Sequence, residues 1–102
     1  MVYETVSIIA NSIVRTAKDV VSCELDGETA ILNARTGIYY GLDEVGACVW
    51  RLLNEPHTVT HIVAAIMSEF DIDMTQCQID VIGLLRELVA HGLVEIADGA
   101  GS

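Results

Sequence analysis

The first clear pattern in the chain is a pair of short apolar segments separated by Asp26-Gly27. An Asp-Gly pair supplies the positive φ angles of a two-residue type I′ turn, so the flanking segments are expected to form a β-hairpin. A second reversal, at residues 35–37, leads into another short apolar segment. The pattern therefore predicts an antiparallel sheet of three strands, the third at an edge, over residues 20–25, 28–33 and 38–42.

Helical spacing follows the third predicted strand. Asp43 stands where an N-cap would open a first helix, because its carboxylate can accept hydrogen bonds from the free N–H groups of the first turn. That helix is expected to stop before Pro56. Apolar residues at i, i+3, i+4 and i+7 predict a second helix, opened by Thr58 or Thr60 and reaching Phe70.

A third helix is predicted after a short turn. Thr75 with Gln78 fits the S/T-x-x-E/Q capping box, and the helix is expected to run from there to His91. Gly92 stands where a C′ glycine would end it. Residues 93–97 are expected to return as a short strand.

The order of these elements predicts the fold. Two helices joined by a tight turn beside a small sheet are typical of a winged helix-turn-helix architecture. We therefore expect an α+β fold with a three-stranded antiparallel sheet followed by three helices. Residues 19–97 form this domain, residues 1–18 are an extra strand, a dimer arm or a tail, and residues 98–102 are a flexible tail.

The predicted third helix has two apolar stripes, where a surface helix of a small domain needs one. At about 100° per residue, the core stripe comprises Cys77, Val81, Leu84 and Leu88. A second stripe lies roughly 120° away, with Leu85 between the two, and comprises Ile79, Ile82, Arg86 and Val89. This second stripe either packs on the sheet or a dimer partner, or forms the wall of a groove for an extended peptide.

Composition and charge narrow the classes of partner. The 102-residue chain has 5 Lys and Arg against 15 Asp and Glu, a formal charge of −10, so nucleic acids and anionic membranes are disfavoured. The third helix would be the DNA-reading helix of a winged-helix regulator, yet it offers Arg86 against Asp80 and Glu87. Hydrophobic residues make up 52%, which favours protein or peptide partners.

Candidate catalytic and metal-binding groups do not form a recognisable site. The three scattered cysteines indicate reduced thiols in a cytoplasmic protein, and the chain shows no signal-peptide pattern. Cys48 has no neighbour that would lower its pKa, and His57 with His61 alone makes a poor zinc site. No glycine-rich phosphate loop appears. We therefore predict no catalytic residue, no metal and no cofactor.

Two stretches of the chain carry a family resemblance. Residues 25–53 read LDGETAILNARTGIYYGLDEVGACVWRLL, and the later stretch has Asp80-Val81, Leu84-Leu85, Leu88 and Gly92-Leu93. This ordered set resembles the PqqD-like family, the precursor recognition elements of ribosomally synthesised, post-translationally modified peptides (RiPPs). The resemblance covers roughly residues 13–97. It implies a small winged-helix domain without catalytic activity that binds the leader of a precursor peptide.

The resemblance also implies where the leader binds. In the family, the leader adds as a strand to the third strand and lies against the third helix. An edge strand has unpaired N–H and C=O groups, which independently favours strand addition there. The expected leader contacts are Ile38, Tyr39, Tyr40, Gly41 and Leu42 of the strand and Ile79, Ile82, Leu85 and Arg86 of the helix. Leu42 is expected to point inward, with Ile38 and Tyr40 on its face.

The resemblance leaves three roles open. In the split lasso-peptide branch, which the chain resembles most, such a protein works with a maturation peptidase and a cyclase. In the quinone-cofactor branch, it presents the precursor to a radical-SAM enzyme. A winged-helix oligomerisation module is the third alternative, and the chain is expected to be a monomer or a homodimer.

Overall fold

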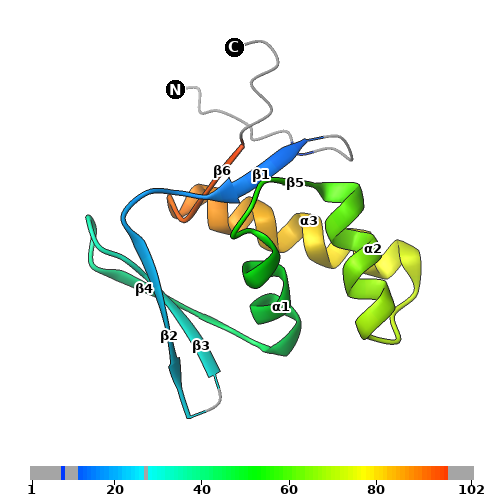
Figure 1. Ribbon diagram of the computed structural model, residues 1–102, viewed down its shortest axis with the longest axis horizontal. Helices are drawn as coiled ribbons and strands as arrows, with labels where there is room; N and C mark the ends of the chain where they lie inside the picture. Colours follow the sequence, from blue (N-terminus) through cyan, green and yellow to red (C-terminus); the bar gives the residue numbers. More distant parts are fainter. Residues whose placement is uncertain (1–7, 9–11, 27, 97–102) are drawn as a thin grey trace.

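The computed structural model describes residues 8, 12–26 and 28–96. It consists of three helices and two small antiparallel sheets (Figure 1), which confirms the predicted α+β fold. The predicted tail at 98–102 and most of residues 1–12 lie outside the described residues. The elements in chain order are β1 Ile13–Thr16, β2 Val20–Leu25, β3 Glu28–Asn33, β4 Ile38–Leu42, α1 Glu44–Leu52, β5 His57–Thr58, α2 Val59–Glu69, α3 Met74–Ala90 and β6 Val94–Ile96.

The sheet β2-β3-β4, called the wing sheet here, is the predicted three-stranded meander. Both of its turns use left-handed backbone conformations: φ is 54° at Asp26 and 76° at Gly37. At the second turn the N–H of Gly37 donates to the carbonyl oxygen of Asn33 at 2.7 Å. The two predicted reversals are therefore confirmed, although Gly27 itself lies outside the described residues.

A second sheet, β5-β1-β6, joins segments that are far apart in the sequence (Figure 1). β1 is its middle strand and pairs with β5 through Ile13 and Thr58, and with β6 through Val14 and Ile96. Val14 is fully buried. Of the three alternatives for residues 1–18, the described part is the extra strand. Its pairing with β5 and β6 packs β1 against the rest of the described chain.

The ends of the helices follow from local capping. The side chain of Asp43 accepts from the N–H of Gly46 at 2.8 Å at the start of α1, and Thr58 accepts from the N–H of His61 at 3.1 Å at the start of α2. After α3, Gly92 has a φ of 73°. The predicted N-cap of the first helix, the first alternative for the second, and the C′ glycine of the third are confirmed.

The start of α3 differs from the prediction. Its N-cap is Asp73, whose side chain accepts from the N–H of Gln76 at 3.1 Å. Thr75 therefore lies inside the first turn, and the predicted capping box with Gln78 is wrong. An aspartate is among the strongest N-cap residues, so it takes the position two residues before the threonine.

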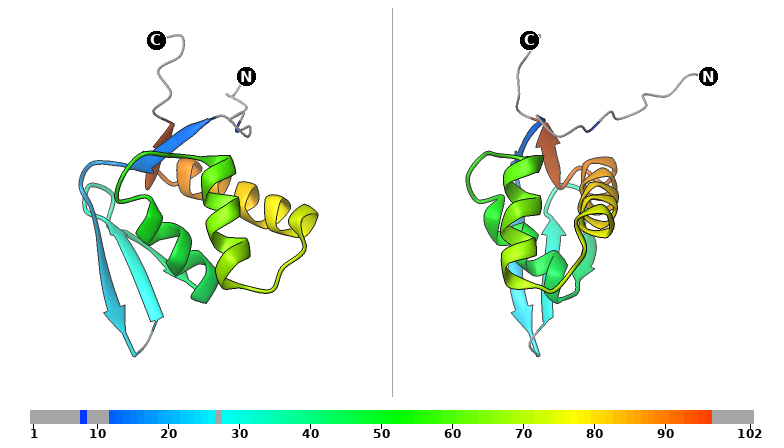
Figure 2. Two further views of the ribbon diagram at one scale, coloured as in Figure 1. Left: turned by 45° about the vertical axis from the view of Figure 1, so that its right-hand side comes forward. Right: turned by 90° about the vertical axis from the view of Figure 1, so that its right-hand side faces the viewer.

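The three helices share one apolar core, and the β2-β3 hairpin points away from the β5-β1-β6 sheet (Figure 2). No described helix is long and apolar enough to cross a membrane. Large side chains with almost no exposed surface come from every helix and from both sheets: Val14, Ile31, Val49, Leu53, Val59, Ile62, Ile66, Val81, Leu85, Leu88 and Leu93.

Candidate functional site

β4 is an edge strand of the wing sheet and pairs only with β3 among the described strands. Its side chains alternate as expected, with Leu42 buried and Tyr40 half-buried on the face that packs on the core. Tyr39 and Gly41 point the other way and are exposed. Ile38, at the start of the strand on the face of Tyr40, is 49% exposed. The outer edge of β4 therefore has backbone groups available for another strand.

α3 lies beside β4 and is joined to it by Tyr40. The Tyr40 hydroxyl donates to the Glu87 carboxylate, and its ring lies 5.5 Å from the His91 ring, centroid to centroid. The hydrogen bond to Glu87 raises the pKa of Tyr40 to about 12, with smaller contributions from burial and from the charges of Glu87 and Asp43. The phenol therefore stays protonated at neutral pH and holds β4 against the last turns of α3.

Asn33, the last residue of β3, makes a second connection, between the β3-β4 turn and the end of α3. Its side chain is buried, with 2% of its surface exposed. Its side-chain oxygen accepts from the N–H of Arg35 at 3.0 Å and of Thr36 at 3.3 Å, within the β3-β4 turn. Its side-chain nitrogen donates to the carbonyls of His91 and Gly92, each at 3.4 Å, at the end of α3. One side chain thus fixes the start of β4 to the end of α3. Nothing in the sequence pattern marked this asparagine.

The second stripe of α3 is largely accessible. Ile79 is 61% exposed, Arg86 is exposed, and Ile82 is half-buried against the core. Leu85, expected to contact a leader, is instead fully buried. Its side chain belongs to the core stripe, and Leu84 is only half-buried beside it.

The direction of the core explains the burial of Leu85. The buried positions of α3 are Cys77, Val81, Leu85 and Leu88. Leu85 follows Val81 by four residues, so it lies on the same side of the helix. In the angular pattern Leu85 lay between the two stripes of α3. The position of the neighbouring elements decides that it belongs to the core stripe.

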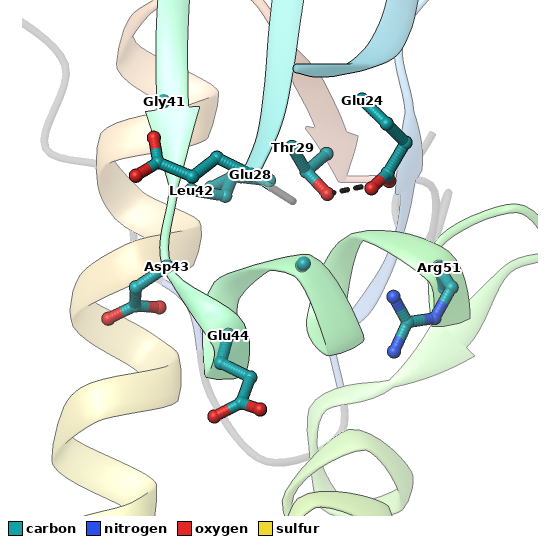
Figure 3. Close-up of a pocket in the computed structure, with 9 residues that line it drawn as sticks. Glu24, Glu28, Thr29, Gly41, Leu42, Asp43, Glu44 and Arg51 are labelled. Atoms are coloured by element: carbon teal, nitrogen blue, oxygen red, sulfur yellow. Dashed lines mark hydrogen bonds between the residues drawn. The ribbon is translucent and has the colours of Figure 1, made fainter. Parts of the chain in front are cut away.

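A hollow of about 810 Å³ adjoins the carboxyl end of β4, between the wing sheet and α1 (Figure 3). Four of its lining residues are acidic, Glu24, Glu28, Asp43 and Glu44, and Arg51 is the one cation. The hydroxyl of Thr29 donates to the Glu24 carboxylate at 2.9 Å. The four carboxylates agree with the acidic composition of the chain, but no local sequence pattern marked this hollow.

Cysteine and histidine side chains are the groups to consider for catalysis or metal binding. Cys48 and Cys77 are buried, and burial raises the pKa of each thiol, which weakens it as a nucleophile. His57 and His61 stack with their ring centroids 4.5 Å apart. Within the described part of the chain, no three His, Cys, Asp or Glu side chains gather as a metal site would require.

Known proteins resemble this chain over most of its length. The family described as coenzyme PQQ synthesis protein D (PqqD) matches residues 28–94. A search of the curated proteins finds no match. A solved structure titled TbiB1 in complex with the TbiA(β) leader peptide is 38% identical, with a TM-score of 0.73, over 82% of this chain and 99% of that one.

Two more distant structures share the fold. One, a lasso peptide synthetase B1 complexed with the leader peptide, is 21% identical, with a TM-score of 0.72 over 80% of this chain and 96% of that one. The other, the PqqD truncation of Methylobacterium extorquens PqqCD, described as a stand-alone RiPP recognition element, is 18% identical, with a TM-score of 0.74 over 87% of this chain and 95% of that one. By the match over residues 28–94 and the similarity to TbiB1, the chain belongs to the PqqD family.

Proposed function

We propose that this chain binds the leader segment of a ribosomally synthesised precursor peptide by strand addition to the outer edge of β4. The observation that carries the proposal is an open strand edge beside the accessible stripe of α3. TbiB1, 38% identical over 82% of this chain, was solved with a leader peptide bound.

The other edge of the wing sheet is less suitable. β2 also pairs with only one described strand, β3. A peptide on β4, however, would lie along α3, whose Glu87 and His91 already contact Tyr40. Burial of side chains is needed besides backbone hydrogen bonds, because the latter contribute only about 1 kcal/mol each. The edge of β4, which lies beside α3, therefore offers a leader both backbone hydrogen bonds and a surface on which to bury side chains.

Different parts of the groove have different roles in this proposal. The backbone of β4 supplies hydrogen bonds and fixes the register, while Ile38, Ile79 and Ile82 contact apolar side chains of the leader, with Arg86 and the exposed part of Tyr40 beside them. Tyr39 contacts the leader from the opposite face of the sheet. A Cβ atom built on Gly41 would meet nothing within 4 Å, so a bulky leader side chain has room there. Leu42 and Leu85 are buried and support the groove from beneath.

The strength of such a complex is set by a few contacts. Two or three buried leader side chains contribute roughly 1.5–3 kcal/mol each, in addition to about five strand hydrogen bonds. After the cost of association, the dissociation constant is expected between tens of nanomolar and about 1 μM.

The role in the pathway is that of a non-catalytic adaptor. We propose that the bound precursor passes to a maturation peptidase and a cyclase of a lasso-peptide system. The motif T-G-x-Y-Y-x-L at residues 36–42 supports this branch, and the B1 structure solved with a leader peptide has the same fold. The quinone-cofactor branch, with a radical-SAM enzyme, is the second candidate, because the matching family is described as a PQQ synthesis protein.

The test is fluorescence polarisation with a labelled leader from the precursor encoded beside this chain, and a scrambled leader as control. Ile79→Glu introduces a charge on the accessible stripe and is expected to weaken binding about 10- to 100-fold. Met74→Glu is the matched control, because Met74 is a similarly exposed α3 side chain, 55% against 61%, but lines a hollow shared with α2.

The proposal of leader binding between β4 and α3 is supported if binding is saturable, is lost on scrambling and in Ile79→Glu, and is kept in Met74→Glu. Equal loss in both variants, or equal binding of the scrambled leader, contradicts it. Replacing the leader with that of a quinone-cofactor precursor distinguishes the two branches, since only the cognate leader is expected to bind at micromolar concentration.

A further inference from the structure

Gly83 is an unusual residue for its position on α3. It lies in the interior of this 17-residue helix and is exposed. Apart from proline, glycine is the least favourable residue in a helix interior, because it loses the most backbone freedom when the helix forms. The described fold does not require it: a Cβ atom built on Gly83 would meet no other described atom within 4 Å, the backbone of α3 itself aside. A glycine of this kind indicates the close approach of another molecule.

Gly83 lies on the side of α3 that faces β4. Glu87 follows it by four residues, one turn along the same side of the helix, and accepts the hydrogen bond of the Tyr40 hydroxyl. Asn33, the partner of the first residue of β4, donates to the two carbonyls at the end of α3. The start of β4 therefore lies at the end of α3, and later residues of the strand lie beside earlier turns of the helix.

The spacings of strand and helix determine what a leader would meet. Four residues of helix rise about 6 Å, and two residues of strand about 7 Å. One turn back from Glu87 is Gly83, and two residues on from Tyr40 is Leu42, on the same face of the sheet. In a leader strand on the edge of β4, the side chain paired with Leu42 would therefore point towards Gly83, and the one paired with Tyr40 towards Glu87.

The space left open by Gly83, called the notch here, has larger side chains around it. Ile79 and Glu87 lie one turn to either side, and Leu84 is the next residue. Ile79 is 61% exposed and Leu84 is half-buried, so both have apolar surface that a bound side chain could cover. A large apolar side chain would cover this surface, whereas an alanine side chain would leave most of the notch empty.

We infer that Gly83 determines which leaders bind: the notch admits one large apolar leader side chain, paired opposite Leu42, into the space between β4 and α3. This inference rests on the proposed function and names a specificity-determining residue within it. A leader with a small residue at this position would lose the burial that the notch offers. A side chain at position 83 would exclude the large one by filling the same space.

The test uses Gly83→Ala and Gly83→Leu. Both introduce a better helix former, so the urea midpoint is expected to rise, by about 0.5 M in Gly83→Ala. Leader affinity, measured by fluorescence polarisation, is expected to fall about 3- to 10-fold in Gly83→Ala and at least about 30-fold in Gly83→Leu. Stability and binding therefore change in opposite directions.

Ala64→Leu is the matched control. Ala64 is a small, exposed residue of α2 that lines the hollow on the α2 side of α3, so the substitution also enlarges a small helical side chain. Leader affinity is expected to stay within about twofold of the wild-type value.

An alanine scan of the leader tests the chemistry of the side chain in the notch. The inference predicts one large apolar leader residue whose replacement weakens binding to the wild-type chain at least about tenfold. The same replacement is expected to weaken binding to Gly83→Leu less than about twofold, because the space for that residue is already filled.

Wild-type leader affinity in folded Gly83→Leu overturns the inference and leaves leader binding itself intact. A lower urea midpoint in Gly83→Ala also overturns it, because the glycine would then serve the fold. Equal losses in the two proteins at every leader position overturn it as well, since no leader residue then depends on the notch. Failure of the wild-type chain to bind leader refutes the proposed function itself.

Discussion

The connection made by Asn33 gives the most direct test of how the groove is held. Asn33→Ala removes four hydrogen bonds from a side chain that is 2% exposed. Bonds of this kind contribute about 0.5–1.5 kcal/mol each, and the two at 3.4 Å belong at the low end. The expected loss is about 3 kcal/mol of the free energy of unfolding, measured by urea denaturation.

A matched control separates this effect from a general one. Asn54 is exposed in the turn after α1, so Asn54→Ala is expected to change stability by less than about 0.5 kcal/mol. Asn33→Asp tests the two halves of the connection, because a carboxylate still accepts from the N–H groups of Arg35 and Thr36 but cannot donate to the carbonyls of His91 and Gly92.

Leader affinity is the second quantity to measure in these variants. If Asn33 sets the distance between β4 and α3, leader affinity falls in Asn33→Asp at a temperature where the variant remains folded. A loss of stability below about 0.5 kcal/mol in Asn33→Ala would refute the account of the connection. Unchanged leader affinity in folded Asn33→Asp would show that the connection stabilises the fold without positioning the groove.

Three further predictions follow from burial and charge. Leu88→Ala is expected to cost about 2–5 kcal/mol in urea unfolding and Leu84→Ala clearly less, because Leu88 is fully buried and Leu84 is half-buried. Tyr40 is expected to titrate near pH 12 by ultraviolet absorbance, and Glu87→Gln to lower that value. Since the folded-state pKa of Tyr40 is above the unfolded value of 10.0, its stabilising contribution is present below pH 10 and lost as the pH rises towards 12. A leader with Lys or Arg near the acidic hollow is expected to bind more weakly as salt rises from about 0.1 to about 1 M, whereas affinity independent of salt would contradict a role for these carboxylates.

Much of the fold could be predicted from the sequence, because its signals are local. The turn at Asp26 and the cap at Asp43 depend on the backbone preferences of single residues, and both are where the pattern put them. The pairing of β1 with β5 and β6 depends instead on contacts between distant segments. β5 has two residues, too few for any alternation to be visible.

The site was predicted less completely than the fold, for a related reason. The edge strand and the exposed Ile79 follow from alternation and helical spacing. The burial of Leu85 depends on where the neighbouring elements lie, which its position between two stripes does not specify. Asn33 makes hydrogen bonds to carbonyls 58 and 59 residues further along the chain, and no local pattern reports such a bond.

The antiparallel pairing of β1 with β6 has a consequence for how this domain can be joined to other proteins. Val14, near the start of β1, is paired with Ile96, at the end of β6, so the chain enters and leaves the fold at neighbouring points. The β2-β3 hairpin lies at the opposite end of the molecule (Figure 1). A linker attached at either end would therefore start at the end of the domain opposite this hairpin. A short tether to a maturation enzyme would raise the effective concentration of captured precursor at that enzyme to the millimolar range, without a new contact.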